Sequence, residues 1–281
     1  MKKAFLLIAI LMTGTVCVTM TSCGDDEPTP AQQQGGNGEN KGDSTENNNP
    51  VNDSTLINDS TVVNDTREYV DLGLPSGTLW ATCNVGADNP EGYGDYFAWG
   101  ETVPYGKEDR SNTHNYASTG SYTKTAFSWD SYKYSTGPYT QTKYCTNSDY
   151  GTVDNKTELD VEDDAAYANW GSRWRMPSKT QFGELTDSSY TTITWTKQNG
   201  INGRLITSRS NGNSIFLPAA GTRGASRIEL VGSFGGYWSR TLYISSQDCA
   251  HGLYFNSEFV SWEYIFGRCN GRSVRPVRVS K

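Results

Sequence analysis

The cysteines are the residues of this chain with the greatest potential for chemistry. Two of them, Cys249 and Cys269, lie near the C-terminus, where the neighbouring basic residues are Arg268 and Arg272. A catalytic cysteine needs a base or a metal to form its thiolate, and an arginine side chain is no base. We therefore expect no catalytic residue. Oxidising conditions outside the cytoplasm favour a disulfide instead, and the three pairings of Cys83, Cys145, Cys249 and Cys269 all stay open.

The remaining titratable residues form no recognisable metal or cofactor motif. His114 and His251 stand in unrelated contexts, without an HExxH or Cys-X-X-Cys partner. The chain also contains no Gly-X-Ser-X-Gly sequence. Asp160, Asp163 and Asp164 offer oxygen atoms that suit Ca²⁺, but acids at a helix start explain them more simply. We expect no metal and no cofactor.

Cys23 points to covalent attachment of lipid. Lys2 and Lys3 precede the 15-residue apolar run Ala4–Val18, and Cys23 follows shortly after. Such a run matches a signal peptide and is shorter than the roughly 20 residues that span a bilayer. We predict a lipoprotein signal peptide over residues 1–22, cleavage before Cys23 and anchoring to the membrane through lipid on Cys23. The alternative is an ordinary cleaved signal peptide with an incidental cysteine.

The residues after Cys23 predict where the protein is displayed. Asp25, Asp26 and Glu27 resemble the acidic signal that sends lipoproteins of the Bacteroides group to the outer face of the outer membrane. A solvated charge run is the simpler alternative. The resemblance implies a lipid-anchored protein in the outer membrane that faces the cell exterior.

Residues 23–66 are expected to form a disordered acidic tether. This segment has no aromatic residue, is rich in Asn, Asp, Ser, Thr, Gly and Gln, and contains a six-residue repeat that begins at Asn52, Asn58 and Asn64. Such a composition buries too little apolar surface to offset the entropy lost on ordering. Triplets such as Asp53-Ser54-Thr55 resemble bacterial O-glycosylation sites, although short polar triplets also arise by chance.

Charge separates the tether from the rest of the chain. Residues 1–66 contain nine acidic and three basic residues, whereas residues 67–281 contain 22 acidic and 21 basic ones. The later part is therefore nearly neutral. Nucleic acids and anionic membrane surfaces are bound by basic faces, so we expect no nucleic-acid partner.

The folded part is expected to be one α+β domain over residues 67–281. All eight Trp and all seventeen Tyr lie beyond residue 66. Alternating or bounded apolar runs predict short strands at 69–74, 77–86, 93–100, 203–208, 214–219, 236–239, 252–256 and 273–278. Asn-Gly pairs at 199–200, 202–203, 211–212 and 270–271 predict tight turns. Helices are expected at 162–170, stopped by Gly171, and from a capping box at Ser178 and Gln181 to about Leu185.

Six sequence blocks, in order, resemble the Fibrobacter succinogenes major paralogous domain, a family common in lipoproteins of gut bacteria. The blocks, which span about Glu68 to Arg278, are YVDLGLPSGTLWATCNVGA at 69–87, GDYFAWGET at 94–102, WRMPS at 174–178, NSIFLPAAG at 213–221, GYWS at 236–239 and SVRPVR at 273–278. The family is similar to the formylglycine-generating-enzyme variety of the C-type-lectin fold. The resemblance implies a domain whose C-terminal sheet and loops present a binding face. In the last block, Arg275 and Arg278 are expected to pair with acids.

The segment from Arg240 to Cys269 is where the resemblance places ligand contacts. Related domains are asparagine-rich here, and most of the residues that replace asparagine, among them Tyr, Phe, Ile, Ser and His, are those that mutation of adenines yields. This pattern is typical of proteins varied by diversity-generating retroelements. Glu258, Trp262 and Glu263 do not fit it, and ordinary divergence of a surface loop is the alternative. Trp262 is expected to be a framework residue. The predicted ligand-binding residues are Tyr243, His251, Tyr254, Phe259, Ser261, Glu263, Tyr264, Ile265 and Phe266.

The physical properties of this segment favour binding over catalysis. Tyr264, Ile265 and Phe266 lie beside Trp262 in a stretch expected to be rich in turns, where such side chains either pack inward or form an exposed anchor. We expect a non-enzymatic, surface-displayed domain that binds a protein or glycan ligand. The alternatives are a structural or adhesion subunit of the cell surface and an oxidase of the formylglycine-generating type.

Overall fold

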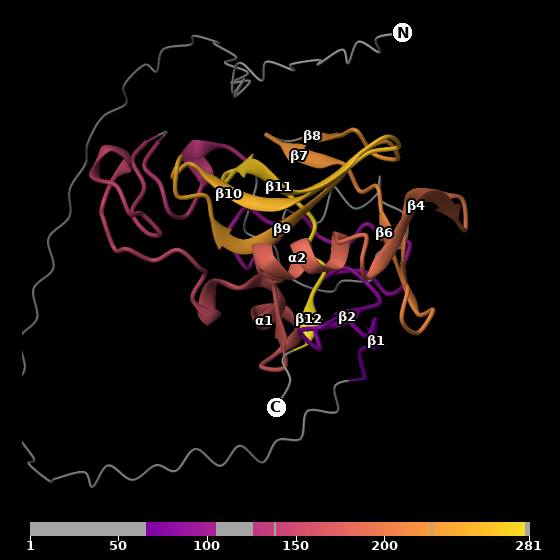
Figure 1. The fold of residues 1–281 in the computed structure, drawn as a ribbon. Helices are drawn as coiled ribbons and strands as arrows, with labels where there is room; N and C mark the ends of the chain where they lie inside the picture. Colours follow the sequence, from indigo (N-terminus) through magenta and orange to yellow (C-terminus); the bar gives the residue numbers. More distant parts are fainter. Residues whose placement is uncertain (1–65, 105–125, 138, 226, 279–281) are drawn as a thin grey trace, which may run out of the picture. The chain divides into compact units, whose positions relative to one another are not determined.

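The computed structural model describes residues 66–104, 126–137, 139–225 and 227–278 (Figure 1). These residues fall in one compact unit, Val62–Lys281. They form mostly antiparallel sheets and two α-helices, which confirms the α+β class. Within this part of the chain, no helix has the length and apolar character needed to cross a membrane. The predictions for the signal peptide, Cys23, the tether and His114 concern residues outside the described ranges.

The strands form four small sheets. One sheet has the order β1 (Tyr69–Asp71), β2 (Leu79–Ala81), β12 (Val277–Arg278) and β3 (Trp174–Arg175). The second contains β4 (Thr191–Gln198), β5 (Ile201–Ser208) and β6 (Ser214–Pro218), and the third has the order β11 (Val260–Gly267), β10 (Cys249–Phe255) and β9 (Gly235–Leu242). A hairpin of β7 (Thr222–Gly224) and β8 (Arg227–Glu229) completes the set. Because β2 pairs with β12, the first and last strands of the domain share one sheet.

The two helices lie where capping residues predict them. The first, α1 (Ala165–Trp170), begins three residues later than expected, because Asp164 is its N-cap and accepts hydrogen bonds from the N–H groups of Ala166 and Tyr167. Gly171 ends it with φ 91°. The residues before Asp164 form a short 3₁₀ helix, η4 (Val161–Asp163), and two further short 3₁₀ helices are η2 (Trp129–Ser131) and η3 (Ser148–Tyr150).

The predicted capping box of the second helix is confirmed. Helix α2 (Lys179–Thr186) has Ser178 as its N-cap; the Ser178 hydroxyl accepts from the Gln181 N–H, and the Gln181 side chain accepts from the Ser178 N–H. Phe182 and Leu185 are its buried residues, and they fix the helix against the sheets.

Several predicted backbone features are wrong or only partly confirmed; the strands predicted at 77–86 and 273–278, for example, are limited to Leu79–Ala81 and Val277–Arg278. Asn202-Gly203 is no turn but lies inside β5, where a Cβ on Gly203 would approach the Leu217 carbonyl oxygen to 2.3 Å. Residues 93–100 form no regular strand. Their backbone groups instead form hydrogen bonds with separate segments. For example, Phe97 N–H donates to Arg272 O, and Trp99 N–H donates to Arg268 O. The predicted turns at Asn199-Gly200 and Asn211-Gly212 do join strands, β4 to β5 and β5 to β6.

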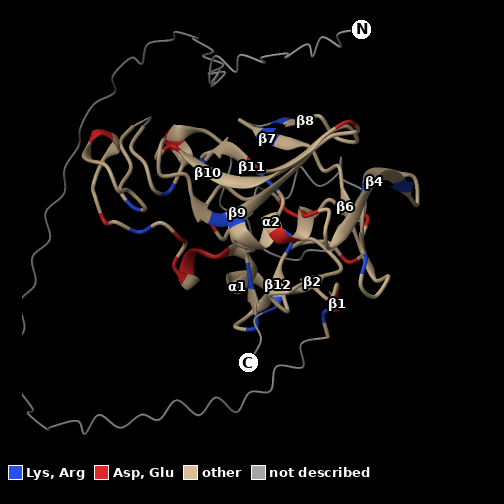
Figure 2. Cartoon of the chain, in the orientation of Figure 1, with Lys and Arg blue, Asp and Glu red and all other residues tan. Residues whose placement is uncertain are grey.

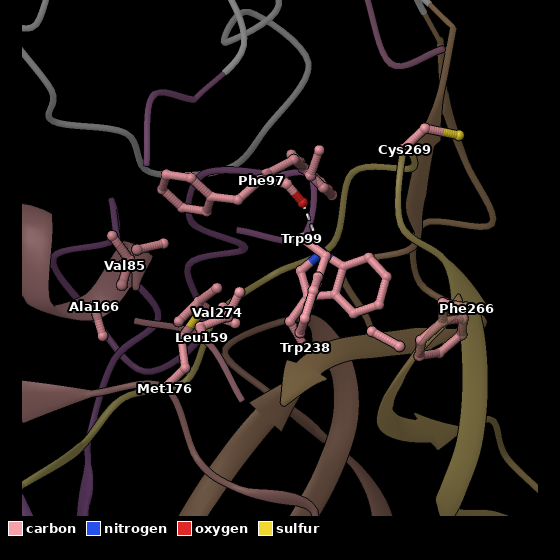
Figure 3. Close-up of a cluster of buried hydrophobic side chains, with 14 of the residues drawn as sticks. Val85, Phe97, Trp99, Leu159, Ala166, Met176, Trp238, Phe266, Cys269 and Val274 are labelled. Atoms are coloured by element: carbon pink, nitrogen blue, oxygen red, sulfur yellow. Dashed lines mark hydrogen bonds between the residues drawn. The ribbon is translucent and has the colours of Figure 1, made fainter. Parts of the chain in front are cut away.

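A tryptophan pair occupies the centre of the larger hydrophobic cluster. Trp99 and Trp238 are fully buried, and Figure 3 shows them between Val274 and Phe266. The Trp238 indole N–H donates to Phe97 O at 2.7 Å, so this buried donor is satisfied. Phe266 therefore belongs to the core of the domain.

The buried Arg275 connects separate segments of the chain mainly through backbone carbonyl groups. Arg275 is fully buried and donates to Asn84 Oδ1 and to the carbonyl oxygens of Ala81, Thr82 and Phe216. The expected pairing of Arg275 with an acid is wrong, since the five N–H donors of a guanidinium suit several carbonyl oxygens at once. Arg278 lies over the ring of Tyr69, 4.4 Å from its centroid.

Candidate binding surface

Most of the residues predicted to bind ligand lie on the hairpin of β10 and β11. The prediction of a turn-rich segment here is wrong, because β11 is an eight-residue strand paired antiparallel with β10. Its β-branched and aromatic residues suit a pleated, half-buried surface. Because side chains alternate along each strand, the predicted residues lie on two opposite faces of the hairpin.

One face carries the aromatic strip, which we define as Tyr254, Phe259 and Tyr264. Phe259 is 49% exposed and Tyr264 is 40% exposed. The rings of Tyr254 and Tyr264 stack with centroids 4.5 Å apart, and those of Tyr254 and Phe259 are 5.3 Å apart. Rings in contact hold one another in place, so the strip presents apolar area that is already ordered.

Small residues opposite the tyrosines make this stacking possible. Tyr264 lies opposite Gly252 in the ladder, and Tyr254 lies opposite Ser261. Neither tyrosine has a large cross-strand partner, so the two rings meet along the diagonal, a distance that aromatic side chains can bridge. The predicted residue Ser261 therefore lies beside the strip and leaves room for it.

Two buried rings, those of Phe266 and Phe234, contact the strip. Phe266 is 5% exposed and its ring centroid lies 5.0 Å from that of Tyr264, while Phe234 lies 5.1 Å from Tyr254. The prediction that Phe266 is exposed for ligand contact is wrong, because its ring packs against Trp238 in the core. The guanidinium of Arg272 lies 4.4 Å from the Phe266 ring centroid, and burial lowers the pKa of Arg272 to about 10.

The opposite face of the hairpin turns toward α2 and is largely closed. His251 is 8% exposed, lies opposite Ile265, and makes an edge-to-face contact with the ring of Tyr243 at 5.3 Å. Burial, with a smaller effect of the Lys179 charge, lowers the pKa of His251 to about 4. Burial argues against direct ligand contact by His251, and Tyr243 and Ile265 share this face, away from the aromatic strip.

Trp262 and Glu263 lie where β11 bulges toward α2. The register shifts between Gly252 and Tyr254, so that both residues stand opposite Leu253. Trp262 packs over Gly183 of α2, as expected for a framework residue. The Glu263 side chain is 65% exposed and lies 3.8 Å from the Lys179 ammonium.

Three residues that shape the strip were not predicted. Phe234 contacts Tyr254, and Arg272 lies over the rings of Phe234 and Phe266; both come from outside the hairpin, so no spacing within the segment could have revealed them. Asn256 shapes the hairpin tip: its Oδ1 accepts from the N–H groups of Glu258 and Phe259, and its Nδ2 donates to the Tyr254 hydroxyl. An asparagine before a polar pair is a turn signal that could have placed this tip.

The charged residues are dispersed over the described chain, as Figure 2 shows. The hairpin from Cys249 to Gly267 carries only Glu258 and Glu263 as charged side chains. Ligand contact with the aromatic strip therefore depends on desolvation of apolar surface. Glu258 and Glu263 add a small negative charge beside the strip.

The cysteines form no disulfide within the described residues. Cys145 is buried and its thiol lies 3.1 Å from the Asn147 carbonyl oxygen, while Cys83 is half-buried. Cys249 and Cys269 are each 7% exposed. A substrate in solution has little access to either sulfur atom.

The acidic cluster at η4 already holds cationic groups. Carboxylate oxygens of Asp160, Glu162 and Asp163 lie within 4.8 Å of one another, an arrangement able to hold a metal ion. The Lys143 ammonium lies 2.7 Å from Asp160 and 2.6 Å from Asp163. Asp164, the remaining candidate, has its carboxylate engaged by the N–H groups at the start of α1 and by Met176 N–H.

Comparisons with models of protein families, with curated proteins and with solved structures found no match.

Proposed function

We propose that this chain is a surface-displayed lipoprotein whose C-terminal domain binds a protein or glycan ligand without catalysis. The observation that carries the proposal is the aromatic strip, in which the half-buried ring of Tyr254 contacts the exposed rings of Phe259 and Tyr264. Tyrosine gives large contact area at low entropic cost, and aromatic anchors dominate binding hot spots.

The sequence blocks and the fold both support a C-type-lectin-like domain. The six blocks resemble the Fibrobacter succinogenes major paralogous domain. Short sheets with two helices, pairing of the first strands with the last, and a long C-terminal hairpin agree with the fold that this resemblance implies (Figure 1). In such a domain the varied C-terminal segment would supply the ligand contacts, which is where the aromatic strip lies.

The burial of the cysteines favours binding over an oxidase of the formylglycine-generating type. Cys249 and Cys269 are 7% exposed, and the nearby histidine, His251, is itself buried. A structural or adhesion role shares the surface location with our proposal, but it does not explain why apolar rings are held exposed on this hairpin.

The test compares the strip with an equally exposed tyrosine elsewhere. The full chain is screened on a glycan array and a protein array. The same arrays are then probed with the double variant Tyr254→Ser/Tyr264→Ser, called the strip variant, and with the control Tyr190→Ser. Tyr190 is 38% exposed and lies outside the hairpin. We expect probes that lose about 30-fold or more in affinity with the strip variant, the effect of about 2 kcal/mol at a hot spot. Retained binding in the strip variant would contradict the proposed site.

The anchor and the display are tested separately. Cys23→Ala is expected to abolish labelling by a clickable fatty acid and to release the protein from membranes. Replacement of Asp25, Asp26 and Glu27 by Ala is expected to protect the domain from protease added to intact cells. Unchanged labelling, or unchanged cleavage, would refute the respective proposal.

A further inference from the structure

Strand β11 is an open edge of its sheet. The order of the sheet is β11-β10-β9, so β11 has a neighbour on one side only. Across the described residues, no backbone hydrogen bond joins Ser261–Phe266 to any segment except β10. By contrast, the outer side of β9 is bridged, since Tyr237 pairs with Ser273 and Thr241 with Glu158.

The ladder identifies which backbone groups of β11 point outward. Arg268 N–H donates to Asp248 O at one end of the hairpin, and Asn256 N–H donates to Phe259 O at the other. Bonded pairs alternate along an antiparallel ladder. Phe266 and Tyr264 therefore bond to β10, whereas the backbone N–H and C=O of Ile265 and Val260 face away from it.

This edge lacks most of the devices that protect exposed strands. Natural edges are blocked by proline, by lysine, by shortness or by a covering segment. Over its eight residues β11 has neither proline nor lysine, and its only charged residue is Glu263. The protective features present are the bulge at Trp262 and Glu263, the charge of Glu263 and the contact of Trp262 with α2.

From these observations we propose that β11 accepts an extended segment of a partner protein as a fourth strand of the sheet. This inference rests on the proposed function and narrows its ligand to a polypeptide. Main-chain hydrogen bonds to the outward groups of β11 would supply affinity, and side chains at alternate positions would supply specificity. Every second side chain of a strand added here would point to the face of the aromatic strip, and one of them would lie beside Tyr264.

Charge defines the partner segment further and disfavours self-pairing. Glu258 and Glu263 are the only charged side chains of the hairpin. Opposite charges across a ladder attract, so the fitting segment carries Lys or Arg opposite Glu263. Because the aromatic strip lies on one face, the segment alternates apolar residues with polar ones. Two β11 strands related by a two-fold axis would bring both Glu263 carboxylates into the same short stretch of ladder. Like charges opposed in this way are destabilising.

The test uses synthetic peptides with altered backbones. A displayed library of random peptides is selected on the full chain, and the binders are then synthesised with N-methyl groups on every second residue, in each of the two possible phases. A paired strand directs alternate N–H groups to its neighbour, so we expect one phase to lose at least tenfold in affinity and the other to retain it. Tyr264→Ser should weaken the same peptides, and the Ile265 amide should gain protection from hydrogen exchange.

Several results would overturn the edge pairing, and they differ from a failure of the proposed function. Peptides that need Tyr264 but tolerate both N-methylation phases would show a strip that binds without strand addition. If only glycans bind, and their binding depends on Tyr264, the strip likewise binds without strand addition. If, without any peptide, the protection of β11 amides from hydrogen exchange rises with protein concentration, a second copy of the chain is the occupant. Absence of any probe that depends on Tyr264 would refute both proposals.

Discussion

The rings of Tyr254 and Tyr264 stack across the two strands of the C-terminal hairpin, with centroids 4.5 Å apart and planes 27° apart. The two residues are not direct partners in the ladder, because Tyr264 lies opposite Gly252 and Tyr254 opposite Ser261. The contact is therefore diagonal and depends on two small residues. It also determines what substitutions in this hairpin should do.

Neighbouring aromatic residues of β11 should differ sharply in their effect on stability. Phe266→Ala removes a ring that is 5% exposed and should cost about 3–5 kcal/mol through lost transfer energy and a cavity. Tyr264→Ala removes a 40% exposed ring and should cost about 1 kcal/mol, mainly the stacking contact. Denaturant unfolding of the full chain measures both. Equal losses would mean that Tyr264 is a core residue and no binding anchor.

Gly252 should be intolerant of any side chain. A Cβ at this position would lie 2.4 Å from the Tyr237 carbonyl oxygen and 2.8 Å from the Phe266 ring. Gly252→Ala should therefore cost about 1–3 kcal/mol by overpacking. Gly224→Ala is the matched control in a strand, because its Cβ would meet nothing within 4 Å. Comparable unfolding midpoints for the two variants would contradict the packing described for the hairpin.

The parts of the fold that sequence predicts are those with local causes. The Ser178–Gln181 capping box and the Asn199-Gly200 turn depend on residues a few positions apart, and both occur where expected. Asn202-Gly203 carries the same turn signal, but the pairing of β5 with β6 overrides it, and Gly203 is needed there for the close approach of Leu217. Register between strands is a long-range property that a dipeptide does not encode.

The candidate site was predicted as a segment but not as a surface. The sequence placed Tyr254, Phe259 and Tyr264 in one region, yet it could not assign faces without recognising β11 as a strand. The bulge at Trp262 and Glu263 also changes the alternation, so counting along the chain misplaces residues on one side of it. The burial of His251 follows from α2 packing on that face, which only the tertiary structure shows.

Arg268 should be essential for anchoring the segment that contains η2 and η3. It is fully buried and donates to the Tyr132 hydroxyl and to the carbonyl oxygens of Lys143, Tyr144 and Gln247. Arg268→Met leaves these acceptors unsatisfied and should cost about 3 kcal/mol or more. Arg278→Met removes cation–π contacts with the rings of Tyr69 and Trp174 and should cost about 1 kcal/mol. Thermal unfolding compares the two variants, and a small effect at Arg268 would contradict its anchoring role.

His251 should make stability depend on pH below neutrality. Its pKa is about 4 in the folded protein, against 6.5 for an exposed histidine, because burial disfavours the charged form. The unfolded chain therefore takes up the proton first. Stabilisation by neutral His251 is complete above pH 6.5 and is lost as the pH falls toward 4, with a slope of at most about 1.4 kcal/mol per pH unit.

The variant His251→Leu isolates this contribution. Its free energy of unfolding, measured from pH 7 to pH 4, should fall less steeply than that of the unsubstituted chain. Asp163 is present in both proteins, and its contribution is lost mainly below pH 3.8, where the unfolded chain takes up that proton. Parallel pH profiles for the two proteins would show that His251 is accessible to protons in the folded state.

Lys143 should act as the built-in cation of the acidic cluster at η4. Its ammonium lies 2.6 Å from Asp163 and 2.7 Å from Asp160, and the Tyr144 hydroxyl donates to the same Asp163 oxygen at 2.6 Å. Burial alone would raise the pKa of Asp163, but the hydrogen bond from Lys143, helped by the other donors, lowers it to about 2. The stabilisation from ionised Asp163 is thus present above pH 3.8 and is lost as the pH falls toward 2.

Removal of that ammonium should turn the cluster into a site that responds to calcium. Lys143→Met leaves the buried Asp163 carboxylate with the Lys133 ammonium, 3.1 Å away, as its remaining cation among the described residues, and should cost about 3 kcal/mol. Three carboxylates whose oxygens lie within 4.8 Å of one another suit Ca²⁺, so added Ca²⁺ should raise the Tm of Lys143→Met and leave the unsubstituted chain unchanged. Lys156→Met is the control, because Lys156 contacts only Asp160 among these acids and the Lys143 ammonium stays in place. A Tm of the unsubstituted chain that rises with Ca²⁺ would show that the metal displaces Lys143, and the cluster would then be a metal site in the native protein.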